Sequence, residues 1–490
     1  MQVSIFLDQR AKKAEREIIH LHRAFFGTEP LLLEMDADDA FTITLEDGHP
    51  EMVATIEKQS VSYLYEMKID PGRCFYSTKQ IVSHLFVKAI EQLHDKQLPW
   101  GILTGIRPLK LYRKLIDSYS REEAERRLTD FYLMKHSKVQ LLRQVHGIQQ
   151  PIIKDIVALN QQGNGSVSLY LGIPYCPSKC SYCTFSGYFN RSEEEKVAYF
   201  SCLLKEVAAV MEWTVKHQLN IASVYIGGGT PSTLTAYQIK ELLTALGVTK
   251  ELTYSEVTFE AGRPDSLTAE KLSIMKMSGV DRISINPQTF SQQTLTKINR
   301  RHTPKDIVDI YRIAREIGFM HINMDIILGL PGEELKDVQE TLRMLAELQP
   351  DGVTIHTLAL KTKSELKQQY TAEQFRFAQQ IDAMLAHSQQ WAQQQGYLPY
   401  YVYRQKNISG NFENVGYAKV GKHSLYNIYS MEEVMPIIGI GCGAVSKLIN
   451  QRALIHERLA NPVEPRYYIE TIDQIIDKKQ KLLPLILTNR

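Results

Sequence analysis

Two features that the sequence lacks narrow its classification. No stretch approaches the roughly 18 to 20 consecutive apolar residues of a membrane span, and charges interrupt the start MQVSIFLDQRAKKAER where a signal peptide needs apolar residues. An excess of one charge is also lacking, because 57 Lys and Arg face 55 Asp and Glu, for a net charge of +2. That charge is too small to supply the affinity of a typical nucleic-acid binder. We therefore expect a cytoplasmic protein without a membrane or nucleic-acid partner.

Cysteine is scarce, and its distribution is informative. Six cysteines in 490 residues without a secretory signal do not suggest a disulfide framework, since the cytosol keeps thiols reduced. Three of the six fall within eight positions, at Cys176, Cys180 and Cys183. We interpret the scattered cysteines as small buried hydrophobic residues. These are Cys74, Cys202 and Cys442.

The length of the chain predicts more than one domain, because single cores stop growing at roughly 250 to 300 residues. Residues 1–160 combine two predicted strands, within PLLLEMDADDAFTITLEDG, with helical periodicity such as that of IVSHLFVKAIEQLHDK. We expect a separate N-terminal α+β accessory domain there. Residues 161–166 are polar, contain glycine and lack periodicity, so they are predicted to form a linker.

From residue 167 onward, short β-rich runs alternate with amphipathic helical stretches, several of which end at glycine as a helix C-cap would. This alternation implies an α/β fold with parallel pairing, in a doubly wound sheet or in a closed or partial barrel. Six consecutive units favour a partial (β/α)6 barrel over residues 167–365. A C-terminal, mainly helical, substrate-covering extension is expected over residues 366–490. The predicted strands are residues 167–173, 223–229, 255–262, 281–287, 321–329 and 352–360.

Barrels of this kind carry their active site at the C-terminal ends of the strands. In this chain those ends carry unusual residues, and their shared placement is stronger evidence for a site than any one of them. They are the cysteine loop, residues 227–230, Glu260, Gln288 and Asp325.

The clustered cysteines form a CxxxCxxC pattern on one tight loop directly after the first barrel strand. Three thiolates can converge there on one inorganic centre. Structural zinc sites usually combine paired CxxC elements into four ligands, and the sequence has no second pair. A cubane iron-sulfur cluster normally takes four cysteines, so three would leave one iron open for chemistry. A cluster, a zinc site and three structural cysteines are the alternatives at this point.

The CxxxCxxC loop resembles the signature of the radical S-adenosylmethionine (SAM) enzymes. The anaerobic coproporphyrinogen III oxidase group has motifs in the order and approximate spacing of LYLGIPYCPSKCSYCTF, VYIGGGTPS, VTFEAG, RISINPQTF, INRRH and MDIILGLPG. With LPWGILTGIRPLKL and HSLYNIYSMEEVMPIIGIGCGA, the chain looks like the HemZ-type branch of that group. The resemblance implies one 4Fe-4S cluster on Cys176, Cys180 and Cys183, with SAM chelated by the open iron.

The resemblance also implies which residues contact SAM. In the glycine-rich run, Gly228, Gly229 and Thr230 would hold its amino and carboxylate groups, and Glu260 and Tyr170 would contact the cluster-bound molecule. Four further residues match positions that bind a second SAM in relatives. They are Gln288, Arg300, Asp325 and Ala359. Several of these residues also have a structural alternative. The glycines could form a tight turn, and Tyr170 could be a core aromatic. Gln288 could cap a helix, Arg300 could lie in a solvated patch, and Asp325 could pair with a neighbour.

Two departures from the group bear on the substrate. Gly172 stands where many relatives have a histidine, and Phe185 stands where the decarboxylating members have a fourth cysteine. The first hypothesis is oxidative decarboxylation of coproporphyrinogen III to protoporphyrinogen IX, with a flavodoxin or ferredoxin as electron donor. The second is a haem chaperone, whose His-Asn-x-x-Tyr-Trp motif has only a partial counterpart starting at His423. The third is a radical SAM enzyme acting on another, tetrapyrrole-like substrate.

Overall fold

The structure is a computed structural model. It describes residues 3–7, 11–26, 31–33, 41–47, 52–58, 63–69, 76–94, 97–162, 165–183, 187–248, 255–359, 374–405, 412–449 and 455–488. The chain forms two compact units: the first contains Met1–Gln144, Thr357–Ala383 and Val402–Asn414, and the second contains Val145–His356, Met384–Tyr401 and Val415–Arg490. The domain boundaries expected from the sequence near residues 160 and 366 stay predictions. Among the described helices, none combines the length and apolar character that crossing a membrane requires.

The first unit contains a five-stranded sheet with the order β2-β1-β3-β4-β5. β1 pairs in parallel with β2 and β3, whereas β3, β4 and β5 pair antiparallel. The two strands predicted near residues 30–48 are present, but they flank β1 instead of pairing with each other. The strands are β1 (Val3–Leu7), β2 (Leu31–Leu33), β3 (Phe41–Asp47), β4 (Met52–Lys58) and β5 (Tyr63–Ile69). The helices are η1 (Ala11–Ala14), α1 (Glu15–Phe26), α2 (Thr78–His94), α3 (Pro108–Ser118) and α4 (Arg121–Asp130).

The segment around Trp100 anchors the interior of this unit. Trp100 Nε1 donates a hydrogen bond to Glu413 Oε2 (2.9 Å), and Lys138 Nζ lies 2.5 Å from Glu413 Oε1. The Arg404 guanidinium lies 5.7 Å from the centre of the Trp100 ring, and Arg404 N donates to Ile106 O (2.8 Å). A buried carboxylate is costly unless it is paired. The motif LPWGILTGIRPLKL therefore has a structural role in this unit.

The second unit carries the predicted barrel strands side by side, in chain order. The large sheet has the order β12-β13-β11-β10-β9-β8-β7-β6-β14-β15-β16, and the neighbouring pairs from β6 to β10 are parallel. The partial (β/α)6 barrel is thus confirmed. The strands are β6 (Ser166–Ile173), β7 (Asn220–Gly228), β8 (Glu256–Gly262), β9 (Arg282–Ile285), β10 (His321–Leu328) and β11 (Gly352–Thr357).

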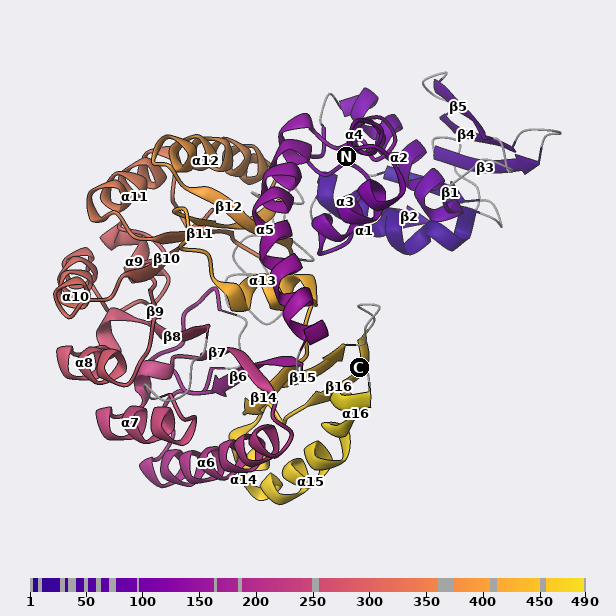
Figure 1. The fold of residues 1–490 in the computed structure, drawn as a ribbon. Coiled ribbons are helices and arrows are strands. Elements are labelled where there is room, and N and C mark those ends of the chain that lie inside the picture. The colour runs from indigo at the N-terminus through magenta and orange to yellow at the C-terminus, as the bar shows by residue number, and fades with distance from the viewer. Residues whose placement is uncertain are drawn as a thin grey trace. The chain divides into compact units, whose positions relative to one another are not determined.

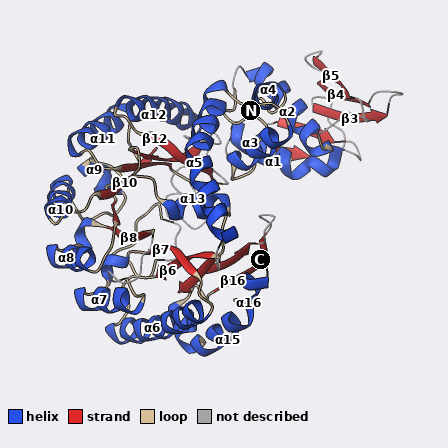
Figure 2. Ribbon diagram, in the orientation of Figure 1, coloured by secondary structure: helices blue, strands red, loops and turns tan. Residues whose placement is uncertain are grey.

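The helices α6, α7, α8, α10 and α11 lie along the outer face of these strands, as Figures 1 and 2 show. The helix α5 ends at Gln162 and β6 begins at Ser166, so the predicted linker is short. The helices are α5 (His136–Gln162), α6 (Glu193–Lys216), α7 (Ala236–Ala245), α8 (Ala269–Met277), α9 (Gln292–Lys297), α10 (Pro304–Glu316) and α11 (Leu335–Leu348), with the short turns η3 (Pro231–Thr233) and η4 (Pro264–Ser266).

Local sequence explains where the barrel helices begin and end. Thr235 and Thr303 start α7 and α10 with capping boxes, in which side chains and backbone N–H groups satisfy each other. The predicted glycine C-caps are confirmed, because Gly247, Gly279 and Gly318 have φ values of 64°, 92° and 99°. Glycine adopts this left-handed conformation without a Cβ penalty.

The C-terminal extension contributes helices, as predicted, and also strands at both sides of the large sheet. β12 and β13 lie beyond β11, and β14, β15 and β16 lie beyond β6. The helices are α12 (Gln374–Gln394), α13 (Leu425–Glu432), α14 (Pro465–Glu470), α15 (Ile472–Leu482) and α16 (Pro484–Thr488). The strands are β12 (Leu398–Arg404), β13 (Glu413–Ala418), β14 (Ile437–Gly441), β15 (Val445–Ile449) and β16 (Ile455–Ala460).

The parallel pair β6–β14 requires glycine at two facing positions, Gly172 and Gly441. A Cβ on Gly172 would lie 2.6 Å from Cys442 O, and a Cβ on Gly441 would lie 2.6 Å from Gly172 O. Gly441 also has a φ of 85°. The Tyr199 hydroxyl donates to Gly172 O (2.5 Å). The glycine that departs from the group's histidine is therefore explained by the close approach of β14.

The buried carboxylate of Glu206 on α6 holds the C-terminal elements against β14. It accepts hydrogen bonds from Gly441 N (2.7 Å), Tyr468 Oη (2.6 Å) and Asn461 Nδ2 (2.9 Å), and it pairs with Lys479. Isolated buried charges cost several kcal/mol, so this set of partners acts as a unit. Cys442, interpreted as a small buried residue, is indeed buried beside this cluster.

We predict that Gly172→Ala destabilises the second unit. The new methyl group would meet Cys442 O at 2.6 Å, and overpacking of this kind costs about 1 to 3 kcal/mol. Gly147→Ala in α5 is the matched control, because its Cβ would meet nothing within 4 Å. Alanine is favoured over glycine in a helix by about 0.5 to 1 kcal/mol. Thermal denaturation should lower the midpoint for the first variant only, and equal midpoints would contradict the packing argument.

Candidate functional site

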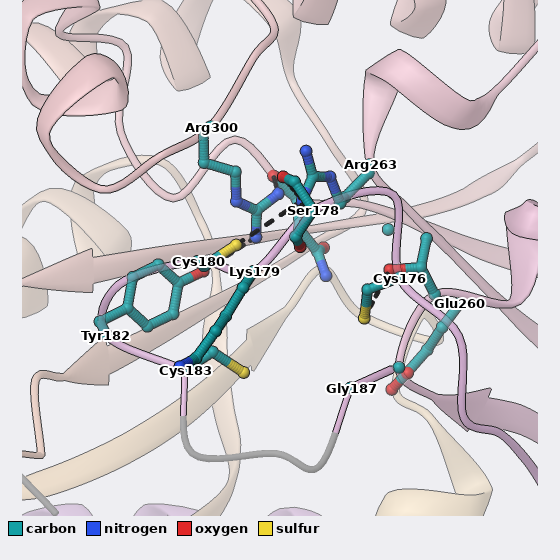
Figure 3. Close-up of a pocket in the computed structure, with 14 residues that line it drawn as sticks. Cys176, Ser178, Lys179, Cys180, Tyr182, Cys183, Gly187, Glu260, Arg263 and Arg300 are labelled. Carbon is teal, nitrogen blue, oxygen red and sulfur yellow. Dashed lines mark hydrogen bonds between the residues drawn. The ribbon is translucent and has the colours of Figure 1, made fainter. Parts of the chain in front are cut away.

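The cysteine loop follows β6 and is closed by backbone hydrogen bonds. Cys176 N donates to Tyr188 O (2.9 Å), and Tyr188 N donates to Pro174 O (2.8 Å). Cys183 N donates to Cys180 O (3.1 Å), which turns the chain between these two cysteines. All three cysteines line one pocket of about 100 Å³, shown in Figure 3.

Residues that the sequence analysis selected from separate segments line the same pocket. Gly229 and Thr230 follow β7, Glu260 lies on β8, and Arg300 follows α9. The fold therefore brings the cysteine loop together with four of the nine other predicted residues. This juxtaposition of distant segments supports a site more strongly than any single motif.

The three thiols surround the pocket without meeting at one point. Among the residues that the structure describes, no three Cys, His, Asp or Glu side chains lie close enough to hold a single metal ion. Burial raises the pKa of Cys176, and the neighbouring thiols Cys183 and Cys180 raise it further, although Thr230 opposes them. Metal binding must supply the energy to deprotonate this thiol.

Glycines around Cys176 leave open a space that a side chain would fill. A Cβ on Gly187 would lie 2.7 Å from Cys176 Sγ, and a Cβ on Gly229 would lie 3.0 Å from the same atom. Thr230 Oγ1 lies 3.5 Å from Cys176 Sγ. Gly228 has a φ of 113°, which favours glycine and turns the run toward the loop. The tight-turn alternative is thus true locally, but the turn serves the cysteine loop.

Glu260 is held by β7 and the glycine run. Tyr225 Oη donates a short hydrogen bond to Glu260 Oε1, and a Cβ on Gly227 would lie 2.8 Å from Glu260 Oε2. Burial raises the pKa of Glu260 to about 7, and the charge of Asp325 raises it further. Hydrogen bonds from Tyr225 and the Gly228 backbone lower that pKa but do not restore its ordinary value. A cation beside Glu260 would favour its ionised form.

Tyr170 belongs to an aromatic cluster inside the barrel. Its ring centre lies 6.1 Å from Tyr225 and 6.2 Å from Tyr426, and the latter two are 4.5 Å apart. Burial raises the pKa of Tyr170, and the charge of Glu260 raises it further. Tyr170 is not among the pocket-lining residues. Its core packing is visible, and its contact with SAM stays a prediction.

Gln288 and Asp325 are joined through the backbone. Gln288 N donates to Asp325 O (2.9 Å), and Ile327 N donates to Gln288 O (3.0 Å). These bonds hold Gln288 at a φ of 66°, which is uncommon for a residue other than glycine. Gln288 Oε1 is buried and has no hydrogen-bond partner among the described residues. That atom is available to a ligand.

The Asp325 carboxylate has several neighbours. Asn323 Nδ2 donates to Asp325 Oδ1 (2.7 Å), and His356 Nε2 lies 3.9 Å from Asp325 Oδ2. Burial raises the pKa of Asp325, but hydrogen bonds to His356, Thr354 and Asn323 outweigh it, so the pKa is lowered overall. The paired-aspartate alternative is therefore partly correct. Ala359 follows β11 and belongs to the first unit.

Arg300 is buried and is not part of a solvated patch. Its Nη2 donates to Tyr182 Oη (2.9 Å), and its Nη1 lies 3.4 Å from Asn286 O. Arg300 Nε and Asn286 Oδ1 are buried without a hydrogen-bond partner in the described part of the chain. Buried polar atoms are normally paired. Two such atoms beside the pocket are consistent with a bound polar ligand.

Arg263 lines the pocket directly after the VTFEAG motif and was not predicted as a site residue. Its side chain is 4% exposed and pairs with Asp265 (2.6 Å). The available signal was the segment RPD, which reads as an ordinary surface turn. Only the fold shows that this arginine faces the cysteine loop.

Some predicted features bear on the site indirectly. Phe185 and Cys74 lie outside the described residues. His423 Nε2 is buried without a hydrogen-bond partner among the described residues, and its ring centre lies 5.5 Å from that of Tyr400. Cys202 on α6 is half-buried, 4.0 Å from Ile469 O.

Comparison with known proteins agrees with the barrel and the cysteine loop. The family model described as the Radical SAM superfamily matches residues 170–345. The solved structure of coproporphyrinogen III oxidase (HemN) from Escherichia coli, titled as a radical SAM enzyme, has a TM-score of 0.52 to this chain at 21% identity. That match covers 69% of this chain and 79% of the other. The fold is thus that of the radical SAM class.

Two curated relatives narrow the assignment. The oxygen-independent coproporphyrinogen-III oxidase-like protein HemZ of Bacillus subtilis is 37% identical over 475 residues, covering 94% of this chain and 92% of the relative. The haem chaperone HemW of B. subtilis is 36% identical over 199 residues, covering 40% of this chain and 52% of the relative. The chain therefore belongs to the radical SAM superfamily and, within it, to the family of HemZ-like proteins.

Family membership implies a 4Fe-4S cluster and SAM. The residues present fit these groups, because three thiols surround one pocket, glycines leave space beside Cys176, and Gln288 Oε1 and Asn286 Oδ1 lack partners among the described residues. Three cysteine ligands would leave one iron open. The structure thus supports a radical SAM enzyme.

We predict that Glu260 makes the SAM-free protein less stable as the pH rises from about 4.5 to 7. Its pKa is raised from 4.5 to about 7 on folding. The contribution is full below pH 4.5 and is lost as the pH passes through 7, by about 3 kcal/mol in total. Glu260→Gln should remove this part of the slope.

The measurement is the free energy of unfolding at pH 5 and pH 7.5, in wild type and variant. Glu91 and Glu333 also have pKa values raised to about 7 by burial, so only the difference between the two proteins reports on Glu260. Parallel pH profiles would contradict the prediction.

Proposed function

We propose that the protein catalyses the oxygen-independent oxidative decarboxylation of coproporphyrinogen III to protoporphyrinogen IX in porphyrin biosynthesis. The observation that carries the proposal is the single pocket lined by Cys176, Cys180, Cys183, Glu260 and Arg300. Family membership supports radical chemistry. The printed names of the HemZ and HemN relatives support a porphyrinogen substrate.

In this proposal, Cys176, Cys180 and Cys183 ligate one 4Fe-4S cluster through their thiolates. When bound, the cluster and SAM together supply a 5′-deoxyadenosyl radical, and the protein positions them. The glycine cradle beside Cys176 keeps side chains out of the space around this thiol. Backbone hydrogen bonds at Cys176 and between Cys180 and Cys183 hold these parts of the loop.

The other pocket residues would orient SAM. Gly228, Gly229 and Thr230 would present backbone and hydroxyl groups to its amino and carboxylate ends. Glu260 would contact the cationic part through a charge-assisted hydrogen bond, worth roughly 1.5 to 3 kcal/mol. Tyr170 would contact the cluster-bound SAM from the aromatic cluster inside the barrel.

The substrate chemistry involves two propionate side chains. Each would lose one hydrogen atom from its β-carbon, then CO₂ and one electron, which would pass to a one-electron acceptor, so that a vinyl group is left. Reduction of the cluster requires an electron donor, for which we propose a flavodoxin or ferredoxin in the cytoplasm. Two reacting propionates are consistent with two SAM molecules.

A second SAM would bind at Gln288, Arg300 and Asp325, and the contact of Ala359 with it stays a prediction from the resemblance. The unpartnered Gln288 Oε1 and Arg300 Nε and the ionised Asp325 carboxylate support this assignment. An acceptor, a donor and a negative charge together complement an amino acid with a cationic centre.

A haem chaperone is the second candidate, favoured by the match to HemW over part of the chain. The incomplete counterpart of the chaperone motif at His423, with no tryptophan after Trp391, speaks against this candidate. A radical SAM enzyme acting on another tetrapyrrole-like substrate is the third candidate. Products distinguish the three.

Anaerobic incubation of the reconstituted protein with SAM, reductant and coproporphyrinogen III should yield vinyl products and 5′-deoxyadenosine. Cys180→Ala should lose the four-iron complement, SAM cleavage and the vinyl products together. Cys202→Ala is the matched control, because this thiol on α6 lies outside the pocket, and it should keep all three. SAM cleavage without vinyl products would redirect the proposal to another substrate, and stable haem binding without cleavage would favour the chaperone.

The number of bound SAM molecules tests the second site. We expect two per chain in the wild type and one in Asp325→Asn, with porphyrinogen turnover reduced at least tenfold. The amide keeps the shape of the side chain, so the melting temperature should change little. One SAM per chain in the wild type would refute the two-site arrangement. A large loss of stability with unchanged stoichiometry would assign Asp325 to the scaffold.

A further inference from the structure

Arg263 contacts the cysteine loop from the end of β8. Its Nη1 donates to Ser178 Oγ (3.0 Å) and Ser178 O (3.2 Å), and it lies 3.7 Å from Cys180 Sγ. Figure 3 shows the arginine and Cys180 side chains approaching across Ser178. Of the two arginines that line the pocket, Arg263 reaches a cysteine sulfur, whereas Arg300 bonds Tyr182.

The guanidinium is fixed in one orientation. Arg263 Nε donates to Asp265 Oδ1 (2.9 Å) and Arg263 Nη2 donates to Asp265 Oδ2 (2.6 Å), a bidentate pair that sets the plane of the group. Pro264 stands between them and restricts the backbone of the turn. With Nε and Nη2 committed to Asp265, Nη1 is left to face the loop. The arginine keeps its charge at every accessible pH.

An N–H group aimed at a ligating sulfur favours the reduced form of an iron-sulfur cluster. The added electron places negative charge partly on the sulfur atoms, so hydrogen bonds to them strengthen on reduction and raise the potential. The side chain of Arg263 is 4% exposed, so water screens this effect little. Asp265 acts in the opposite sense, because its negative charge lies on the far side of the guanidinium.

We propose that Arg263 is a positioning residue of the cysteine loop that raises the reduction potential of the cluster held there, through its contact with Cys180 Sγ. The proposal rests on the cluster ligation argued above. Asp265 orients the guanidinium and moderates its charge. The pair thereby matches the cluster to its electron donor.

The test is a redox titration of the full-length, anaerobically reconstituted protein, followed by the electron paramagnetic resonance signal of the reduced cluster. Arg263→Gln should shift the ratio of reduced to oxidised cluster about tenfold toward the oxidised form at a fixed potential, or about 59 mV for a one-electron couple. Arg263→Lys should shift it in the same direction by less, since the charge stays and the fork is lost. Iron content should stay at four per chain in both variants.

Asp265→Asn supplies a change of opposite sign. It leaves Arg263 in place without the negative partner, so the cluster should become easier to reduce than in the wild type. A merely structural pair would give the same result for both residues, namely loss of iron. Arg315→Lys is the matched control. Arg315 lies on α10 and pairs with Asp351 (2.7 Å), so this variant should leave the potential of the cluster unchanged.

The outcomes separate this inference from the proposed function. Wild-type potentials in Arg263→Gln, Arg263→Lys and Asp265→Asn, with full iron, would overturn the role of Arg263 and leave the cluster assignment standing. Loss of iron in both Arg263→Gln and Asp265→Asn would show that the pair only holds the loop. A wild-type chain that binds no four-iron cluster would overturn the cluster assignment and this inference together.

Discussion

The close approach of the glycine run after β7 to the cysteine loop after β6 is the constraint on which the site depends. Gly229 N donates to Ile173 O (2.7 Å) and Thr230 N donates to Tyr175 O (2.8 Å), so the run is bonded directly to the start of the loop. At these distances a Cβ on Gly228 or Gly229 would meet backbone atoms. The same absence of side chains leaves space beside Cys176. The absence of side chains at Gly228 and Gly229 therefore allows both the close packing of the two segments and the space beside Cys176.

Polar groups around the pocket fall into two kinds. Arg263 has a bonded partner for each of its three nitrogen atoms, and such a buried ion gains its orientation from neighbours within the protein. Gln288 Oε1, Asn286 Oδ1 and Arg300 Nε are buried but have no partner among the described residues. Unpaired buried groups cost about 1 to 3 kcal/mol each. A ligand that bonds these unpaired atoms would offset this cost. The paired Arg263 therefore shapes the site, whereas the unpaired atoms suit ligand binding.

Much of the barrel was predictable, because strands that alternate with helices permit few topologies and glycine C-caps mark helix ends. The pairing of β14 with β6 was not, since it depends on contacts between Gly172 and Cys442 that are remote in sequence. The cysteine loop was predictable from spacing alone. Arg263 was not, because its neighbours Ser178 and Cys180 are supplied by a different strand end. Local patterns identify elements and motifs, whereas partners across the fold appear only in three dimensions.

Glu260 and Asp325 share the barrel interior but differ in their protonation. Burial raises the pKa of Glu260 to about 7, whereas hydrogen bonds to His356, Thr354 and Asn323 overcome the burial of Asp325 and lower its pKa. Asp325 is then ionised at neutral pH, while Glu260 is close to half protonated. A cation that arrives beside Glu260 favours the ionised form, so its binding would release a proton. Affinity for a cationic ligand would therefore rise with pH through 7, in the range where the same carboxylate makes the ligand-free fold less stable. Ligand binding and folding thus place opposite demands on one buried group.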